Sequence, residues 1–96
     1  MLESKFQANL IKELKERFPG CWVMKNDANY RQGFPDLTVY YKDKYAFLEV
    51  KQSKDSPHRP NQDVYIEEGN KMSFARFIYP ENKEEVLNDL QQTFQP

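Results

Sequence analysis

Two short segments place charged side chains where the surrounding residues favour buried strands. Pro35-Asp36 opens one segment, and Glu49-Val50-Lys51 closes the next. An ionised carboxylate between apolar neighbours, as Glu49 is, is costly unless it is paired or binds a metal ion. Two carboxylates and a lysine at one strand end are the groups that Mg²⁺-assisted hydrolysis of a phosphodiester requires, because Mg²⁺ takes oxygen ligands and polarises the phosphoryl group.

The two segments belong to a predicted β-hairpin. Residues 36–41 and 45–51 are rich in β-branched and aromatic side chains, and they flank a polar turn at 42–44. Side chains alternate between the two faces of a strand, so one face of this hairpin is expected to be wholly apolar. That face consists of Leu37, Val39, Ala46, Leu48 and Val50.

The turn determines which residues of the hairpin are neighbours. If the chain turns through residues 42–43, Asp36 lies directly opposite Glu49, with Cβ atoms about 5 Å apart. Lys51 then shares their face. Like charges placed so are destabilising unless a cation lies between them, which favours a metal site. The alternative is a salt-bridged surface hairpin, in which the three charged side chains only solvate one face.

The remaining elements follow from periodicity and from turn residues. Apolar residues at helical spacing predict helices, polar stretches predict loops, and apolar or alternating runs predict strands. In chain order we expect a helix over 2–18, a strand over 21–25, a loop over 26–35, the hairpin, a loop over 52–59, a helix over 60–68 ended by Gly69-Asn70, a strand over 73–79 and a helix over 81–94. This order, α-β-β-β-α-β-α, predicts an α/β fold in which an antiparallel meander is followed by a helical crossover to a parallel fourth strand. The result is a small mixed sheet flanked by helices.

The composition is typical of a globular domain. The 96 residues are 39% apolar and 30% charged, enough for one modest core, so residues 1–96 are expected to form a single domain. The aromatic share of 15% provides large side chains for that core. No apolar run approaches the ~20 residues of a membrane span, and the segment MLESKFQ shows no secretory signal. These features predict a cytoplasmic protein without a membrane partner.

The chain has too few cysteine and histidine residues for a disulfide or for a zinc site built from these residues. With one cysteine, Cys21, and one histidine, His58, an internal disulfide and a Cys/His zinc site are excluded. A thiol nucleophile would need the two residues to meet. Cys21 stands beside the apolar Trp22 and Val23, which favours a buried and inert thiol instead.

The net charge of −1 by itself argues against a nucleic-acid-binding protein, but this charge is unevenly distributed. Residues 1–59 contain eleven Lys/Arg and eight Asp/Glu, a net charge of +3, whereas residues 60–96 have a net charge of −4. A basic half can face phosphates, and bound metal ions would add positive charge to it.

The pair of motifs, together with the order of elements, resembles the PD-(D/E)xK nuclease superfamily, which has a restriction-endonuclease-like core. GFPDL (33–37) and FLEVK (47–51) carry most of the resemblance, which extends over about residues 3–79. Within the superfamily, the chain looks most like the minimal VRR-NUC domains of phage proteins and the archaeal Holliday junction resolvases. Members of this lineage are expected to be basic, and this chain departs from them in that respect.

The resemblance implies metal-dependent cleavage of DNA. Asp36 and Glu49 would bind Mg²⁺, or Mn²⁺ in its place, together with the carbonyl oxygen of Val50. Lys51 would be the catalytic lysine, able to orient a water molecule or to stabilise charge on the phosphoryl oxygens.

Two further residues match positions that such families often use. Glu3 corresponds to an acid on the first helix, and Gln62 corresponds to a glutamine on the helix after the strand that ends at Lys51. Each also has a plain alternative role. Glu3 can interact favourably with the helix dipole, and Gln62 can be a solvated residue of a first helical turn.

Polar and basic residues next to the predicted metal site are candidates for contacts with DNA. Basic side chains can grip phosphates, and a tyrosine can stack on a base. The candidates are Lys25, Tyr30, Arg31, Ser53, Lys54 and Arg59. Phosphate contacts carry no sequence information, so recognition of DNA structure is expected rather than of sequence. The alternative is that both loops are only polar connections.

These observations together predict a Mg²⁺-dependent, structure-selective DNA endonuclease, best described as a Holliday junction resolvase in the cytoplasm, or in the host cytoplasm if it is phage-encoded. Cutting two strands of a junction needs two active sites, which suits a homodimer. The apolar stripe of helix 81–94 is expected to pack on the sheet, and would become a dimer surface if only partly covered. The alternatives are a nicking, flap or restriction-type nuclease, and a non-catalytic interaction module with the same fold.

Overall fold

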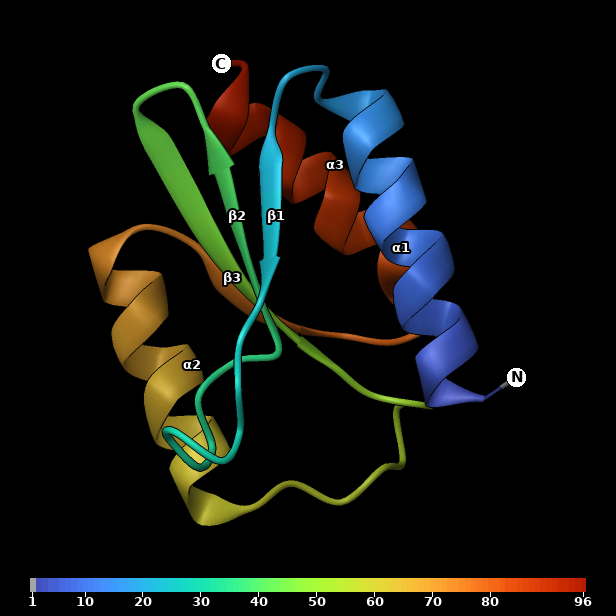
Figure 1. Cartoon of the computed structure of the whole chain (residues 1–96), viewed down its shortest axis with the longest axis vertical. Helices are drawn as coiled ribbons and strands as arrows, with labels where there is room; N and C mark the ends of the chain where they lie inside the picture. Colours follow the sequence, from blue (N-terminus) through green and yellow to red (C-terminus); the bar gives the residue numbers. More distant parts are fainter. Residues whose placement is uncertain (1) are drawn as a thin grey trace.

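The computed structural model describes residues 2–96 and contains three helices and four strands. They are α1 (Glu3–Arg17), β1 (Trp22–Lys25), β2 (Leu37–Tyr41), β3 (Lys44–Val50), α2 (Pro60–Met72), β4 (Ala75–Ile78) and α3 (Lys83–Phe94) (Figure 1). The predicted order of elements and the α/β class are confirmed. Among the described residues, no helix has the length and apolar character needed to cross a membrane.

The sheet has the strand order β1-β2-β3-β4, in which β1, β2 and β3 are antiparallel and β4 runs parallel to β3. The hairpin has the register that a turn through residues 42–43 implies, since Leu37 pairs with Leu48 and Val39 pairs with Ala46. The turn comprises residues 42–43, which is the case under which Asp36 and Glu49 were expected to lie opposite each other, and Lys42 is in the left-handed region at φ 57°.

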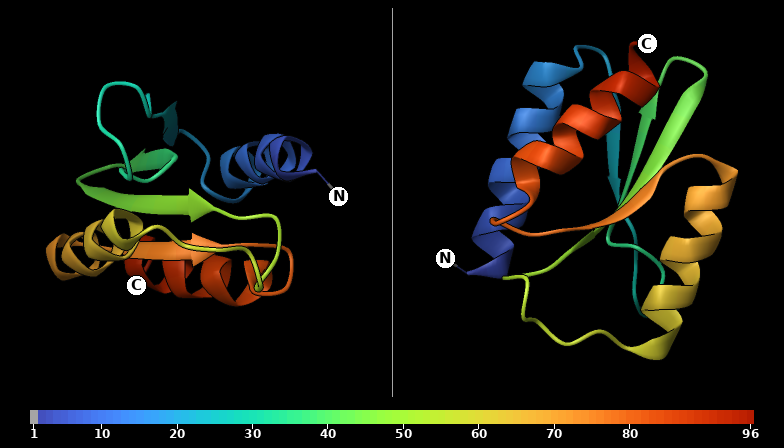
Figure 2. Two further views of the ribbon diagram at one scale, coloured as in Figure 1. Left: turned by 90° about the horizontal axis from the view of Figure 1, so that it is seen from below. Right: turned by 180° about the vertical axis from the view of Figure 1, so that it is seen from behind.

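The two faces of the sheet are covered differently. Helices α1 and α3 lie together on one face, as the view from behind shows (Figure 2), and enclose the apolar face predicted for the hairpin. The stripe of α3, which consists of Val86, Leu87, Leu90 and Phe94, is buried in this core. It is therefore not available as a dimer surface. On the opposite face, α2 packs against β3 and β4.

The expectation that aromatic residues fill the core is only partly correct. Phe18, Tyr41 and Phe94 pack against one another inside it. Trp22 and Tyr40, in contrast, are 71% and 45% exposed. They belong to β1 and β2, whereas α2 packs on this face mainly at β3 and β4.

The predicted end of the second helix at Gly69-Asn70 is wrong, because α2 continues to Met72. Gly69 is buried at the contact between α2 and the sheet, and a Cβ atom there would lie 3.0 Å from the Phe47 ring and 3.1 Å from the Ala75 side chain. This glycine allows the helix to approach the sheet closely and does not end it.

Overpacking this contact should destabilise the fold. Gly69→Val is expected to lower the free energy of unfolding by about 2 kcal/mol, because the added methyl groups must displace the Phe47 ring. Glu68→Val adds the same side chain at an exposed position of α2 and should cost about 0.5 kcal/mol through helix propensity. Urea denaturation measures both. Equal costs for the two variants would contradict the close approach of α2.

Candidate active site

Asp36 and Glu49 lie opposite each other at the point where β2 begins and β3 ends. The amide N–H of Val50 donates to Asp36 Oδ2 over 2.9 Å, and the amide N–H of Asp36 donates to Glu49 Oε1 over 3.2 Å. Each carboxylate thus accepts a hydrogen bond from the backbone of the other strand. The predicted juxtaposition of the two acids is present in the structure.

Burial makes this pair electrostatically costly. Glu49 is only 4% exposed, and Asp36 is half-buried. Burial, followed by the charge of Asp36, raises the pKa of Glu49 to about 8, and burial also raises the pKa of Asp36. Near neutral pH the two carboxyl groups are therefore expected to share a proton when no cation lies between them.

Lys51 and Gln62 complete a network around Glu49. Lys51 is 8% exposed, and its Nζ donates to Gln62 Oε1 over 2.9 Å and to the Pro57 carbonyl oxygen over 3.1 Å. The same Nζ lies 4.0 Å from Glu49 Oε2. Gln62 Nε2 donates to Glu49 Oε2 over 3.0 Å. Gln62 therefore links the carboxylate to the lysine, which brings this predicted residue into the site.

The first turn of α2 holds Gln62 in place. Pro60 is the first residue of the helix, and the amide N–H of Arg59 donates to Gln62 Oε1 over 3.0 Å. This satisfies a backbone donor at the helix start while it orients the glutamine side chain. These contacts are not consistent with the alternative role of Gln62 as a solvated residue of the first helical turn.

Asn26 supports the segment that leads into Asp36. Its Nδ2 donates to the Pro35 carbonyl oxygen and to Thr38 Oγ1, each over 2.9 Å. Neither this role nor the contact of the Pro57 carbonyl with Lys51 was expected from the sequence. Asn26 stands in a loop with several other polar residues, so nothing in the sequence distinguishes it from them. The role of the Pro57 carbonyl leaves no sequence signal, because every residue has a backbone carbonyl.

Glu3 is not brought into contact with the pair. It is an exposed residue of the first turn of α1, although the start of α1 and the end of β3 lie at the same end of the molecule (Figures 1 and 2). Within residues 2–96, no group of three or more Asp, Glu, His or Cys side chains is placed to hold a metal ion. The roles of Glu3 and of the Val50 carbonyl as further ligands stay predictions.

The predicted DNA-contacting residues surround this end of the molecule. The loop that precedes β2 and the loop between β3 and α2 both lie at the lower end in Figure 1. Five of the six candidates have exposed side chains: Lys25, Tyr30, Arg31, Lys54 and Arg59. The sixth, Ser53, is half-buried, and its hydroxyl accepts a hydrogen bond from the Asp55 amide. Their contact with DNA stays a prediction.

Cys21 takes no part in the site. It is buried, and its Sγ donates to the Leu14 carbonyl oxygen over 3.7 Å. Burial raises the pKa of this thiol, so it is the inert thiol that was expected. His58 instead stacks on Phe77 with ring centroids 3.9 Å apart, and its Nδ1 lies 3.0 Å from Asp63 Oδ1.

The donor set at Asp36 and Glu49 fits a divalent cation such as Mg²⁺ or Mn²⁺. Carboxylate oxygens are the ligands that Mg²⁺ prefers, and it commonly takes only one or two of them from a protein. The like-charge repulsion in the pair is the term that a cation between the two groups would remove. Asp36 and Glu49 are the residues that would hold the ion.

The raised pKa of Glu49 predicts how stability depends on pH in the metal-free protein. Because this pKa rises from 4.5 to about 8 on folding, the native state binds more protons between these values. The free energy of unfolding should therefore fall as the pH rises from about 5 to about 8.5. The corresponding decrease in Tm is expected to be about 5 °C or more. Glu49→Gln cannot titrate and should vary much less in thermal unfolding followed by circular dichroism. Parallel curves for the two proteins would contradict the shift.

Divalent cations should stabilise the protein at a pH at which both Asp36 and Glu49 are ionised. At about pH 8, millimolar Mg²⁺ or Mn²⁺ is expected to raise the Tm by several degrees, because binding to the native state alone shifts the folding equilibrium. Asp36→Asn should lose this effect, and Asp43→Asn, an exposed acid in the hairpin turn, should keep it. NaCl at matched ionic strength controls for screening. An equal rise in Tm with NaCl would argue against a specific site.

Comparisons with protein-family models, with curated proteins and with solved structures found no match to this chain. The resemblance to the PD-(D/E)xK superfamily therefore stays a prediction.

Proposed function

We propose that the protein is a divalent-metal-dependent DNA endonuclease of the PD-(D/E)xK type. The observation that carries the proposal is the hydrogen-bonded network of Asp36, Glu49, Lys51 and Gln62, in which two carboxylates face each other and a lysine lies 4.0 Å from one of them. Strongly shifted pKa values at a charged partner are typical of functional sites.

Burial argues against the alternative of a solvated surface hairpin. Glu49 and Lys51 are 4% and 8% exposed, whereas residues that only solvate a face keep their charges in water. A buried ion pair seldom adds net stability, because desolvation offsets the attraction. A buried and a half-buried acid that both have raised pKa values are thus better explained by a bound cation than by structural stabilisation.

The side chains of the site have distinct roles in the proposed hydrolysis. When bound at Asp36 and Glu49, a divalent cation supplies Lewis-acid polarisation of the phosphoryl group and lowers the pKa of a bound water. The Lys51 ammonium group would stabilise negative charge that develops on the phosphoryl oxygens. Gln62 is a positioning residue, since its amide oxygen accepts from Lys51 while its amide nitrogen donates to Glu49.

Selectivity for branched DNA, in particular for Holliday junctions, is part of the proposal and is supported by the resemblance described above. A homodimer would bring two such sites to two strands. Its interface would have to use a surface other than the apolar stripe of α3, which is buried. Nicking, flap and restriction-type activities are the alternatives that a substrate panel separates.

Cleavage assays test the proposal with four-way junctions, flaps and linear duplex in the presence of Mg²⁺ or Mn²⁺. The wild type should cleave junctions best, and EDTA should abolish cleavage. Asp36→Asn and Lys51→Met should each reduce the rate about 100-fold or more, whereas Asp43→Asn, at the far end of the same hairpin, should stay within about two-fold.

The outcomes separate the parts of the proposal. Equal cleavage of junctions and linear duplex would remove the resolvase assignment and leave the nuclease. No cleavage of any substrate, together with no metal-dependent change in Tm, would contradict the enzyme and favour a non-catalytic module.

A further inference from the structure

The half of the sheet that α2 leaves open carries a group of exposed aromatic and apolar side chains. Trp22 and Tyr40 are cross-strand partners, and Met24 follows Trp22 on the same face of β1. These side chains are 71%, 45% and 52% exposed, respectively. Large apolar side chains gathered on an open surface favour a binding site.

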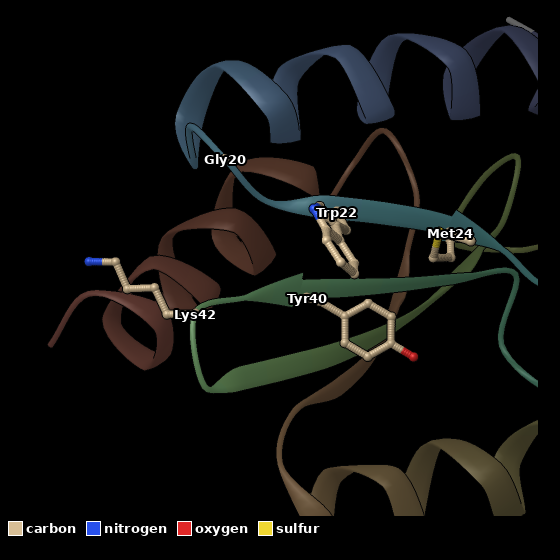
Figure 3. A pocket seen from close by; sticks show the side chains of 5 residues that line it. All are labelled: Gly20, Trp22, Met24, Tyr40 and Lys42. Carbon is tan, nitrogen blue, oxygen red and sulfur yellow. The ribbon is translucent and has the colours of Figure 1, made fainter.

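This group lines a hollow of about 630 Å³. Its walls are Gly20, Trp22, Met24, Tyr40 and Lys42. Figure 3 shows the side chains of Trp22, Met24 and Tyr40 on the same side of the two strands, with Lys42 at the turn beyond them. The hollow is thus bordered by two rings and a thioether, and none of its lining residues is acidic. The Lys42 ammonium group points away from these rings in Figure 3 and lies 5.2 Å from the centroid of the Tyr41 ring, so it would have to rotate to reach a ligand in the hollow. We call these lining residues the β1–β2 platform.

The rings of the platform are available for stacking. Within residues 2–96, neither Trp22 nor Tyr40 packs against another aromatic ring, in contrast to the paired rings of the core. An aromatic face with a flexible lysine at its edge matches the two parts of a nucleotide, because every base has a face that can stack and every phosphate is negative.

The platform and the candidate active site share one face of the sheet. Along β2 the side chains of Asp36 and Tyr40 project to the same side, four residues apart. At ~3.3 Å per residue this separation is ~13 Å. A DNA strand with an axial spacing of ~3.4 Å per nucleotide would cover it in about four steps. One strand can therefore reach both places.

We propose that the β1–β2 platform binds unpaired nucleotides of a DNA strand, with bases stacked on Trp22 and Tyr40 and a phosphate near Lys42. The choice of DNA as the ligand rests on the proposed function. The inference adds a defined surface that recognises unpaired bases. Branched DNA and flaps offer such bases, whereas an intact duplex does not. The platform is thus a source of structure selectivity that needs no base-specific hydrogen bond.

A second copy of the chain is the other occupant to consider for an apolar surface. The lining contains no acidic residue and has Lys42 at its edge, which favours a negatively charged ligand over a self-complementary contact. The net charge of +3 over residues 1–59, which include the whole platform, points the same way.

Trp22 is the only tryptophan of the chain, so its fluorescence reports on the platform directly. In EDTA, which prevents cleavage, a short oligodeoxythymidylate should quench this fluorescence in a saturable manner. The same bases in a duplex should quench it much less. Tyr40→Ala should weaken binding of the single strand about ten-fold, the cost of one lost stacking partner, and Val64→Ala, an exposed apolar residue of α2, should leave it unchanged.

A second variant keeps the test valid if Tyr40→Ala does not fold. Lys42→Gln should weaken binding and reduce by about one the slope of log affinity against log salt, because one phosphate contact is lost. An unchanged slope and affinity would overturn the role of Lys42 at the platform.

Two results would overturn the inference as a whole. One is an absence of quenching by the single strand. The other is a blue shift of Trp22 emission as the protein concentration rises without DNA, which would show that a second copy covers the platform. The fluorescence test is independent of catalysis. Quenching without cleavage would support DNA binding at the platform and contradict the nuclease proposal. Cleavage without quenching would contradict only DNA binding at the platform.

Discussion

The register of the β2–β3 hairpin is the constraint on which the candidate site depends. Side chains alternate along a strand, so a slip of one residue in either strand would move that strand's carboxylate into the core, expose its apolar residues and separate the two acids. Leu37, Val39, Ala46 and Leu48 are fully buried beneath α1 and α3, and their burial rules out such a slip. The hydrophobic core thus holds Asp36 and Glu49 together although their charges repel.

The structure limits this repulsion without removing it. Backbone amides donate to both carboxylates, and Gln62 and Lys51 surround the remaining oxygen of Glu49. The pKa of Glu49 nevertheless rises to about 8. The pair is least favourable when both acids are ionised and no cation is present, which is understandable if the arrangement binds a cation. The same sheet face, left uncovered by α2 at β1 and β2, provides room for a ligand next to that site.

Much of this could be predicted from the sequence, because the relevant signals are local. The hairpin pairing followed from alternation and a two-residue turn, and the parallel fourth strand followed from the helical crossover. Gly69 misled the prediction of where α2 ends, since a glycine that ends a helix and one that permits close packing look alike in one sequence. The exposure of Trp22 and Tyr40 was missed for a related reason, because exposure depends on where α2 packs. The contacts of Lys51 with Gln62 and the Pro57 carbonyl join residues from two elements and a loop, and no local pattern encodes them.

The central claim is that a divalent cation binds between Asp36 and Glu49, and a crystal soaked in Mn²⁺ at mildly alkaline pH tests it most directly. Anomalous scattering should place an ion in contact with carboxylate oxygens of both residues, with Lys51 and Gln62 adjacent to it. Manganese found only elsewhere, with the two carboxylates still held by Val50, Gln62 and each other, would contradict the account.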